Sequence, residues 1–405
     1  MPRSCDAAEL AAGKSPILTL IQSERVMKLS CLQENLSRGL GIVGRAVATR
    51  STLPITQNVL LSTDQSMLKL SATNLEIGIT TWVGGMIEEE GLITVPARLL
   101  SEFVSSLPND RIDLELLPGT GVLELKCGRA EARINGADAS EFPPIPAVED
   151  GVGAQIEQQV LKDAISRVAF AAATEESRPV LTGVELRLQG DRFTLAAADG
   201  FRLAVQHGPL AATVEQDIVV IIPAKTLNEL NRLLGDVSEP VEILMTPSKG
   251  QVLFRLPGIE LVSQLLQGSF PNYDQLIPQS YQTRAVFDLQ ALLRATRTAA
   301  IFARDGSNII RVQVIPESDG ESSGKALISA RSEEVGDNQD EVDAETIEGD
   351  EAKIAFNSRY LQEVLSVLEK GKVALETTSP SSPGVFKPTD SDDYVHVVMP
   401  MFVQW

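Results

Sequence analysis

Few residues in this sequence are of the types that carry out acid–base, nucleophilic or metal chemistry. The chain of 405 residues contains two histidines, His207 and His396, and three cysteines, Cys5, Cys31 and Cys127. No two cysteines stand at the spacing of metal ligands, and an odd, scattered set of thiols is typical of a reducing compartment. A zinc site or a histidine-based triad would lack its usual residues. The sequence therefore predicts no catalytic residue, no metal and no cofactor.

One acidic residue stands in a context that could suggest catalysis. Asp199 precedes Gly200 between the β-rich runs Phe193–Ala198 and Phe201–Val205. An Asp-Gly pair between two such runs is a strong signal for a two-residue hairpin turn. A carboxylate-dependent hydrolase is an alternative that no second motif supports. We interpret Asp199 as a turn former.

Charged residues show a more informative pattern, because cations and anions separate along the chain. Lys and Arg number 35 and Asp and Glu 55, which gives a formal net charge of −20. The acidic residues concentrate in loops and strands, and ten of them lie in Ser332–Glu351. A shared basic face on several helices would contact nucleic-acid phosphates without reading base sequence. For any single residue, a merely solvated helix surface explains the charge equally well. The predicted basic face comprises Arg38, Arg45, Arg50, Lys162, Arg167, Lys225, Arg232, Arg294 and Arg297.

Three stretches of the chain follow one plan. In each, a β-rich run leads into a helix start, and this anchor recurs after 127 residues (Pro96 to Pro223) and again after 134 residues (Pro223 to Asn357). A second anchor closes each stretch and recurs after 128 and 129 residues, so the period is confirmed independently. The first anchor reads Ile93–Arg98, Val220–Lys225 and Ile354–Arg359. The second reads Glu141–Pro143, Ser269–Pro271 and Val398–Pro400.

Each stretch is predicted to contain two helices and several antiparallel strands, which is an α+β plan. The second helices follow the first anchor, and the longer first helices show apolar stripes at helical spacing. These stripes are Leu32, Leu36, Leu40, Val43 and Val47; Leu161, Ala164, Ile165, Val168 and Ala172; and Leu289, Leu292, Leu293, Thr296 and Ala300.

Domain boundaries follow from linker-like segments at Pro143–Gly153 and Pro271–Gln282. We expect three similar domains at 27–150, 151–280 and 281–405, called here the first, second and third repeats. Residues 1–26 are expected to form a disordered extension, or to reflect a start codon placed too far upstream. The extra residues of the third repeat fall in Glu317–Lys325, which we interpret as a lengthened loop.

Seven short motifs occur in one order from Met27 to the end of the chain. Together, on a threefold repeat, they resemble the bacterial sliding clamp family, the beta subunits of DNA polymerase III. The motifs are Arg50–Ile55, Thr73–Glu76, Val95–Arg98, Ala198–Val205, Gly268–Tyr273, Phe356–Tyr360 and Val397–Met401.

The resemblance implies a head-to-tail homodimer that closes a ring of six similar domains around duplex DNA. Helices would line the hole, sheets would form the outside, and the ring would act as a processivity factor in DNA replication. Weak phosphate contacts let such a ring slide while it tethers its polymerase. Its partners would be the DNA polymerase III alpha subunit, the clamp loader delta subunit, other polymerases including repair polymerases, and mismatch-repair proteins. Its place would be the cytoplasm, on the nucleoid, with no membrane contact.

The resemblance also implies an apolar cleft that binds short partner peptides. Two positions depart from the family: Phe201 stands where His is usual, and Phe402 where a basic residue is usual, so the cleft is expected to prefer apolar peptides. Deleting Val397–Trp405 is expected to abolish partner binding and leave the ring folded. An alternative is that Val397–Met401 is simply the last core strand. The implied cleft residues are Leu181, Ala198, Gly200, Phe201, Arg202, Leu203, Pro271, Asn357, Tyr360, Val397, Val398, Met399, Pro400 and Met401.

A dimer contact is suggested by two apolar residues that lie off the stripe of the third repeat's first helix. These are Ile301 and Phe302, and the resemblance pairs them with Phe103 and Leu107 of the first repeat. Packing within their own domain is the alternative. A monomeric three-domain peptide-binding scaffold is the competing function, and in it the basic helix residues would be dispensable.

Overall fold

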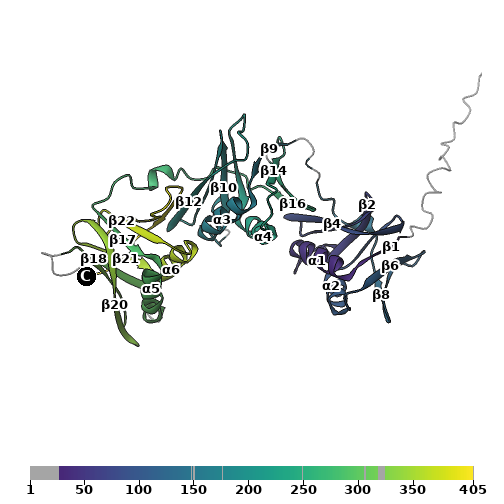
Figure 1. The fold of residues 1–405 in the computed structure, drawn as a ribbon, viewed down its shortest axis with the longest axis horizontal. Coiled ribbons are helices and arrows are strands. Elements are labelled where there is room, and N and C mark those ends of the chain that lie inside the picture. The colour runs from purple at the N-terminus through teal and green to yellow at the C-terminus, as the bar shows by residue number, and fades with distance from the viewer. Residues whose placement is uncertain are drawn as a thin grey trace, which may run out of the picture. The chain divides into compact units, whose positions relative to one another are not determined.

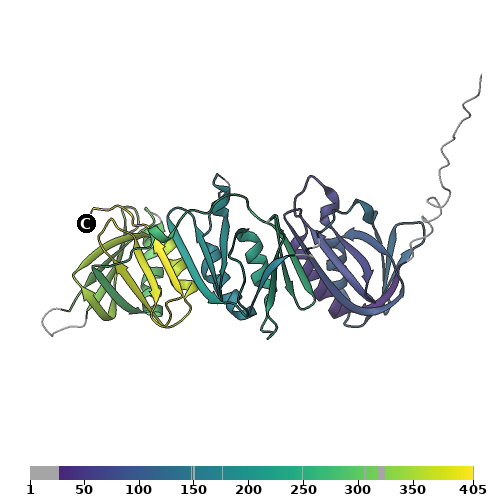
Figure 2. The ribbon, with the colours of Figure 1, turned by 90° about the horizontal axis from the view of Figure 1, so that it is seen from above.

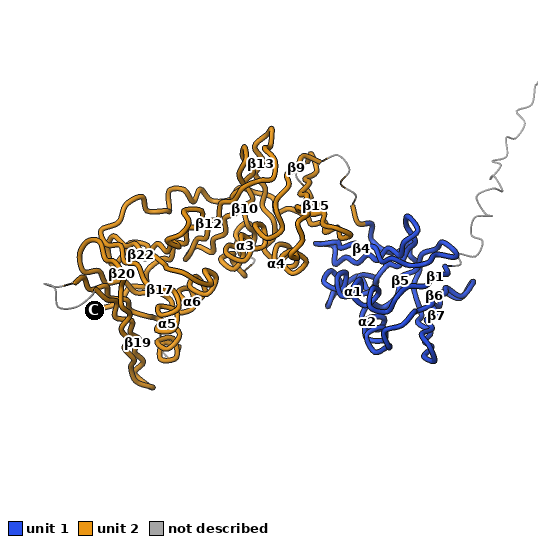
Figure 3. The backbone as a smooth tube through the Cα atoms, in the orientation of Figure 1, with its two compact units in different colours: residues 1–144 blue, residues 145–405 orange. Residues whose placement is uncertain are grey.

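The structure is a computed structural model that describes residues 27–146, 148, 151–175, 177–248, 250–304, 307–317 and 324–404. The chain divides into two compact units, Met1–Pro144 and Ile145–Trp405 (Figure 3). The predicted extension 1–26 lies outside the described residues, as do residues 318–323 of the expected loop. In the part of the chain that is described, no helix has the length and apolar character needed to cross a bilayer.

The first unit is an antiparallel sheet wrapped around two helices. Its strands follow the order β8-β7-β6-β1-β4-β3-β2-β5. Helix α1 packs on β3 and β4, and α2 on β2 and β5. The elements are β1 (Lys28–Leu32), α1 (Gln33–Val43), β2 (Asn58–Asp64), β3 (Met67–Thr73), β4 (Ile77–Glu89), β5 (Leu92–Pro96), α2 (Ala97–Ser106), β6 (Arg111–Leu117), β7 (Val122–Cys127) and β8 (Ala130–Asn135).

The second unit applies the same plan twice. In its first half the strands are β9 (Val152–Ile156), β10 (Gly183–Gln189), β11 (Arg192–Ala198), β12 (Arg202–Pro209), β13 (Ile218–Pro223), β14 (Val241–Met245), β15 (Gln251–Leu256) and β16 (Ile259–Gln264), with helices α3 (Gln158–Val168) and α4 (Ala224–Leu233). In its second half they are β17 (Thr283–Asp288), β18 (Ile309–Ile315), β19 (Lys325–Ser332), β20 (Gly336–Gly349), β21 (Ala352–Asn357), β22 (Lys372–Thr377), β23 (Gly384–Pro388) and β24 (Tyr394–Val398), with helices α5 (Leu289–Arg304) and α6 (Ser358–Val367).

Strand pairing repeats with the elements. Strands β5-β2-β3-β4, β13-β10-β11-β12 and β21-β18-β19-β20 form equivalent antiparallel groups. Within the second unit, β12 pairs with β24, so the second and third repeats share one continuous sheet. Figure 1 shows α3, α4, α5 and α6 along one side of this unit, and from above its strands lie over them (Figure 2). The predicted α+β plan is therefore confirmed.

The second helix of each repeat starts where the sequence predicts. Pro96, Pro223 and Asn357 occupy the cap position just before α2, α4 and α6. A proline there sacrifices no helical hydrogen bond. Asn357 also caps its helix with its side chain, whose oxygen accepts a hydrogen bond of 2.9 Å from the Arg359 amide.

The first helices differ from the prediction in their ends. Helix α1 stops at Val43, and Arg45 lies in a 3-10 turn, so Arg38 and Arg45 do not share one helix face. Three glycines within Gly39–Gly44 weaken this helix. Leu32 is the last residue of β1 and is exposed, and Val47 follows the turn, so neither extends the stripe. In α5 the stripe continues through Ala299 and Ala303 rather than Ala300.

The Asp199 turn is shifted by one residue from the prediction. Asp199 and Arg202 close the turn, since the Asp199 amide donates to the Arg202 carbonyl at 3.3 Å. The two central residues are Gly200, with φ +93°, and Phe201. A positive φ at the first central position suits glycine and a tight hairpin. Phe201 is therefore held at the tip of the hairpin rather than in strand β12.

Candidate functional site

The thiols and carboxylates of the described residues form no metal site. Cys31 and Cys127 are free and buried, and burial raises the pKa of Cys31 to about 12. Their strands, β1 and β7, flank β6, so Ile112 separates them in the sheet. Two strand spacings exceed the reach of a disulfide. Cys5 lies outside the described residues.

Basic side chains on the helices differ from those on the strands in how they are paired. Strand cations are mostly neutralised: Arg255 pairs with Glu242 at 2.6 Å and with Glu260 at 3.0 Å. On the helices, by contrast, Arg294 and Arg297 are exposed and, within the described part of the chain, have no carboxylate within 4 Å. Two other helix arginines of the second unit are paired, Arg232 with Glu229 and Arg359 with Glu363, so Arg294 and Arg297 stand apart from them.

The remaining predicted basic residues differ in solvent exposure and in their contacts. Arg38, Arg45, Arg50, Lys225 and Arg232 are exposed, and Lys162 and Arg167 are half-buried. Arg232 is paired with Glu229 on its own helix, and Arg167 donates to the Gln206 side chain at 3.3 Å. Arg50 follows α1 in a stretch without regular structure.

The four predicted dimer residues are exposed to different extents. Ile301 is 60% exposed near the end of α5, and its neighbour Phe302 is half-buried. Phe103 on α2 is also half-buried, whereas Leu107 is buried in the first unit. Ile301, Phe302 and Phe103 thus retain apolar surface that a partner could cover, and Leu107 supports the fold instead.

A pocket of about 460 Å³ opens beside the tip of the β11–β12 hairpin. We call it the Phe201 pocket. One wall is the segment after α3, a second is the hairpin tip, and a third is the start of α6. Its lining residues are Ala172, Ala173, Thr174, Glu175, Ser177, Arg178, Asp199, Gly200, Phe201, Arg202, Arg359 and Tyr360.

Two aromatic side chains form one wall of this pocket, whereas Thr174, Glu175, Ser177, Arg178, Asp199, Arg202 and Arg359 make the rest of the lining largely polar. Phe201 is 61% exposed and stacks on Tyr360, with ring centroids 6.5 Å apart. Met399 is exposed and distant from Phe201 in sequence but close to it in space, since its amide donates to the Phe201 carbonyl at 2.8 Å. Phe402, three residues on, is 84% exposed. Such surface suits an apolar side chain of a bound peptide.

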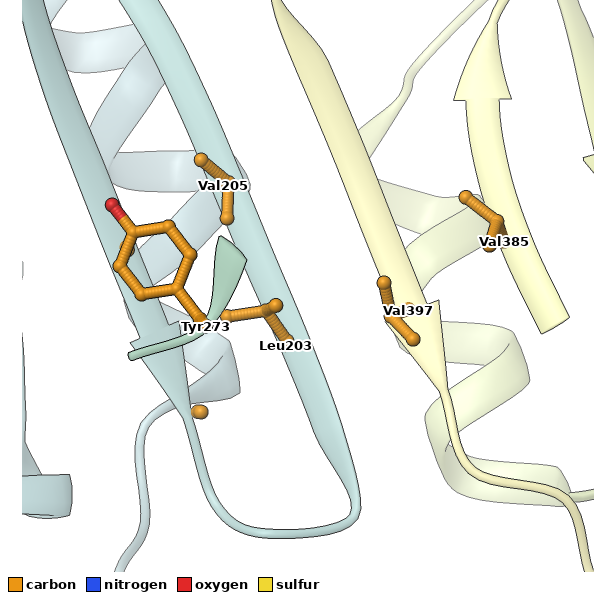
Figure 4. Close-up of a cluster of buried hydrophobic side chains, with 7 residues drawn as sticks. Leu203, Val205, Tyr273, Val385 and Val397 are labelled. Carbon is orange, nitrogen blue, oxygen red and sulfur yellow. The ribbon is translucent and has the colours of Figure 1, made fainter. Parts of the chain in front are cut away.

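The structure places the predicted cleft residues in different environments. Gly200, Phe201, Arg202 and Tyr360 line the pocket. Ala198, Leu203 and Val397 belong to a buried cluster with Val205, Tyr273 and Val385, which joins β12 to β24 (Figure 4). Of the others, Leu181, Val398 and Pro400 are buried, Asn357 and Met401 are half-buried, and Pro271 and Met399 are exposed.

The proposed deletion of Val397–Trp405 needs correction. Val397 and Val398 are buried residues of β24, paired with Leu203 and Arg202 of β12. Removing them would break the sheet that joins the second and third repeats. A truncation that begins at Phe402 leaves the strand intact.

Several pocket residues were missed by sequence reasoning. The segment Ala172–Arg178 contributes half of the lining, yet beyond Ala172, which ends a predicted apolar stripe, it shows no apolar periodicity that would mark it as a site. Tyr273 was assigned to a linker, but it is only 3% exposed and edge-packs on Phe270 at 6.2 Å. The aromatic pair in Phe270–Tyr273 is the signal that this segment is packed rather than free.

A buried histidine lies close to the pocket residue Arg202. His396 on β24 is completely buried, and its ring stacks on Phe170 at 5.5 Å. Its Nδ1 lies 3.2 Å from the Tyr394 hydroxyl, and among the described residues its Nε2 has no hydrogen-bond partner. Burial, and next the nearby Arg202 guanidinium, lower the pKa of His396 to about 3.

Acid is expected to destabilise the second unit through this histidine. Its folded pKa lies below the unfolded value of about 6.5, so the unfolded chain binds the proton first, and stability is lost as pH falls below about 6.5 at about 1.4 kcal/mol per pH unit. Between pH 7 and pH 5, urea unfolding should show a decrease of about 2 kcal/mol, and the His396→Phe variant should lose most of that dependence.

The chain offers a clean control for this measurement. His207 is the one other histidine, and burial lowers its pKa as well. A His207→Gln variant should keep the decrease that His396 causes. An unchanged pH dependence in His396→Phe would contradict the assignment.

Comparison with known proteins places the whole described chain in one family. Sequence models of the DNA polymerase III beta subunit match its N-terminal domain at residues 27–146, its central domain at 155–272 and its C-terminal domain at 274–402. The chain belongs to the DNA polymerase III beta subunit family. The beta sliding clamp of Synechococcus elongatus is 34% identical over 93% of this chain and 99% of that protein, and that of Bacillus subtilis is 29% identical over the same shares.

Solved clamp structures share the fold. The sliding clamp of Bacillus subtilis superposes with a TM-score of 0.87 at 29% identity, covering 93% of this chain and all of that one. A Pseudomonas aeruginosa sliding clamp, solved bound to griselimycin, gives a TM-score of 0.85 at 31% identity over the same shares. The family resemblance read from the seven motifs is confirmed.

Proposed function

We propose that this sliding clamp closes as a homodimeric ring around duplex DNA and tethers the replicative polymerase, without catalysing a reaction itself. The pairing of its cations carries the proposal. Arg294 and Arg297 on α5 stay exposed and unpaired among the described residues, while strand cations such as Arg255 are held by carboxylates. Free cations on the helices attract phosphates without base specificity, and the acidic remainder discourages binding elsewhere. The protein would work in the cytoplasm, on the nucleoid.

The Phe201 pocket is the proposed binding site for partner peptides. Its volume of about 460 Å³ and its exposed aromatic wall suit a few apolar side chains of a short peptide. The proposed partners are the DNA polymerase III alpha subunit, the clamp loader delta subunit, other polymerases and mismatch-repair proteins. We also propose that griselimycin, which is bound to the Pseudomonas aeruginosa clamp, binds in this pocket.

The ring contact is proposed between the third repeat of one copy and the first repeat of the other. Ile301 and Phe302 on α5 would pack against Phe103 on α2 of the other copy. Two strand edges support this arrangement. Among the described strands β8 pairs with β7 alone, and residues 336–343 of β20 pair with β19 on one side. Open edges of this kind readily accept another strand.

Retention on DNA circles tests the ring directly. The protein is loaded by the clamp loader onto closed circular DNA, the complex is isolated by gel filtration, and half of it is cut once with a nuclease. We expect the protein to stay on intact circles and to be lost from cut ones. Equal retention on both forms would show ordinary binding and would overturn encirclement.

Salt dependence tests the helix cations. Replacing Arg294 and Arg297 by Gln should reduce the slope of log affinity for duplex DNA against log salt by about one for each arginine. Arg255→Gln is the matched control, since that arginine is already paired with two carboxylates. A slope that falls equally in the control would contradict the proposed DNA-facing surface.

A further inference from the structure

The wall of the Phe201 pocket stands at the end of a row of stacked side chains. Phe201 and Tyr360 stack with their planes 23° apart. Behind them, the Arg202 guanidinium lies 4.6 Å from the Tyr360 ring centroid and 5.1 Å from that of Phe170. Phe170 stacks in turn on His396, with the two planes 11° apart. The Arg202 guanidinium thus contacts both a ring of α6 in the third repeat and a ring of the 3-10 turn that follows α3 in the second.

Arg202 is held by several contacts within the protein. Its side chain is 5% exposed. Its Nε donates to Asp199 at 3.1 Å, its Nη2 donates to the Phe170 carbonyl at 2.7 Å, and its Nη1 pairs with Glu363. Each of its three nitrogens thus makes a contact within the protein, which uses three of the five N–H groups. Because the side chain is nearly buried, we expect Arg202 to influence binding mainly through the residues that it holds.

The backbone of Phe201 depends on one of those residues. The amides of Phe201 and Arg202 both donate to Asp199 Oδ1, at 2.8 Å and 3.0 Å. The other carboxylate oxygen, Oδ2, is the one that Arg202 Nε holds. Arg202 thereby orients the carboxylate that shapes the hairpin tip, while its guanidinium packs on the Tyr360 ring.

We propose that Arg202 is a positioning residue of the Phe201 pocket. It fixes the hairpin tip through Asp199 and fixes α6 through Glu363 and Tyr360, so that Phe201 and Tyr360 form one rigid apolar wall. A preorganised wall binds an apolar side chain without first having to order its own rings. This inference rests on the proposed function of the pocket as the partner-binding site.

The test uses griselimycin as the probe and the full-length dimer as the protein. Arg202→Lys keeps the positive charge near Asp199 and Glu363, but a lysine lacks the flat guanidinium and its fork of donors. We expect this variant to bind griselimycin about tenfold more weakly, and Phe201→Ala to lose about tenfold as well. Arg187→Lys is the matched control. Arg187 also lies over an aromatic ring, that of Tyr273 at 5.6 Å, but outside the pocket.

A double-mutant cycle separates positioning from general loosening of the fold. If Arg202 acts through the wall, then Arg202→Lys combined with Phe201→Ala should bind little worse than either single variant, because the wall is already lost. Losses that multiply to about a hundredfold would show independent effects and overturn the proposal. Unchanged affinity in Arg202→Lys would overturn it too.

A second variant protects the test against misfolding. Phe170→Leu removes one of the two rings that contact the Arg202 guanidinium, and Phe170 itself does not line the pocket. If Arg202→Lys does not fold, Phe170→Leu should still weaken griselimycin binding severalfold, and unchanged binding would count against positioning. A wild-type protein that fails to bind griselimycin and is not retained on circular DNA would refute the proposed function instead.

Discussion

Replacing Ile301 by Glu is expected to convert the clamp into a monomer and to abolish its retention on circular DNA. Ile301 is 60% exposed near the end of α5, beside the half-buried Phe302. In the proposed ring, a carboxylate at this position would be moved from water into an apolar contact with Phe103 of the other copy. The cost of that burial should raise the dimer dissociation constant by about a hundredfold or more.

Sedimentation equilibrium at micromolar concentration measures this effect, and the circle assay reports its consequence. Val237→Glu is the control, since Val237 is also an exposed aliphatic residue of the second unit but lies away from α5. It should remain dimeric and retained. A wild-type protein that is already a stable monomer would favour the competing function, a peptide-binding scaffold that never encircles DNA.

Replacing Tyr360 by Ala is expected to disable the Phe201 pocket. The change removes the ring on which Phe201 stacks, and it uncovers the guanidinium of Arg202. Loss of both contacts should weaken binding of griselimycin by about tenfold to a hundredfold, and polymerase tethering should fall in parallel. Fluorescence titration with griselimycin and a processivity assay on a primed template measure the two effects.

Tyr281→Ala provides the comparison for this variant. Tyr281 is an exposed tyrosine of the same unit, and its hydroxyl bonds to Glu348 at 2.9 Å, away from the pocket. It should leave both measurements unchanged. Normal tethering by the Tyr360→Ala protein would mean that partners bind elsewhere, and the pocket assignment would have to be abandoned.

The sequence alone determined the repeat, the kind of fold and the family. These were accessible because they depend on local rules that leave a mark in the order of residues. Helix starts at Pro96, Pro223 and Asn357 follow from backbone geometry, and amphipathic spacing follows from the helical period. Once the motifs stood in order on that frame, the resemblance to sliding clamps could be recognised without coordinates.

The tertiary structure alone decided which of the candidate residues meet. Ala198, Leu203 and Val397 were expected in an open cleft, yet they are packed beneath Tyr273, because β12 pairs with β24 across about 190 residues of sequence. No local pattern encodes such a pairing, since the two strands contribute to one sheet only after both have folded.

Arg202 shows most clearly the difference between what the sequence and the tertiary structure reveal. In the sequence it is one more basic residue within a motif. In the fold its charge is enclosed by Asp199 and Glu363, between the rings of Phe170 and Tyr360. Its partners come from three separate segments, so their joint effect on one guanidinium exists only where the chain brings them together. Sequence revealed the type of side chain, and long-range packing determined that it serves as an internal support rather than as a surface charge.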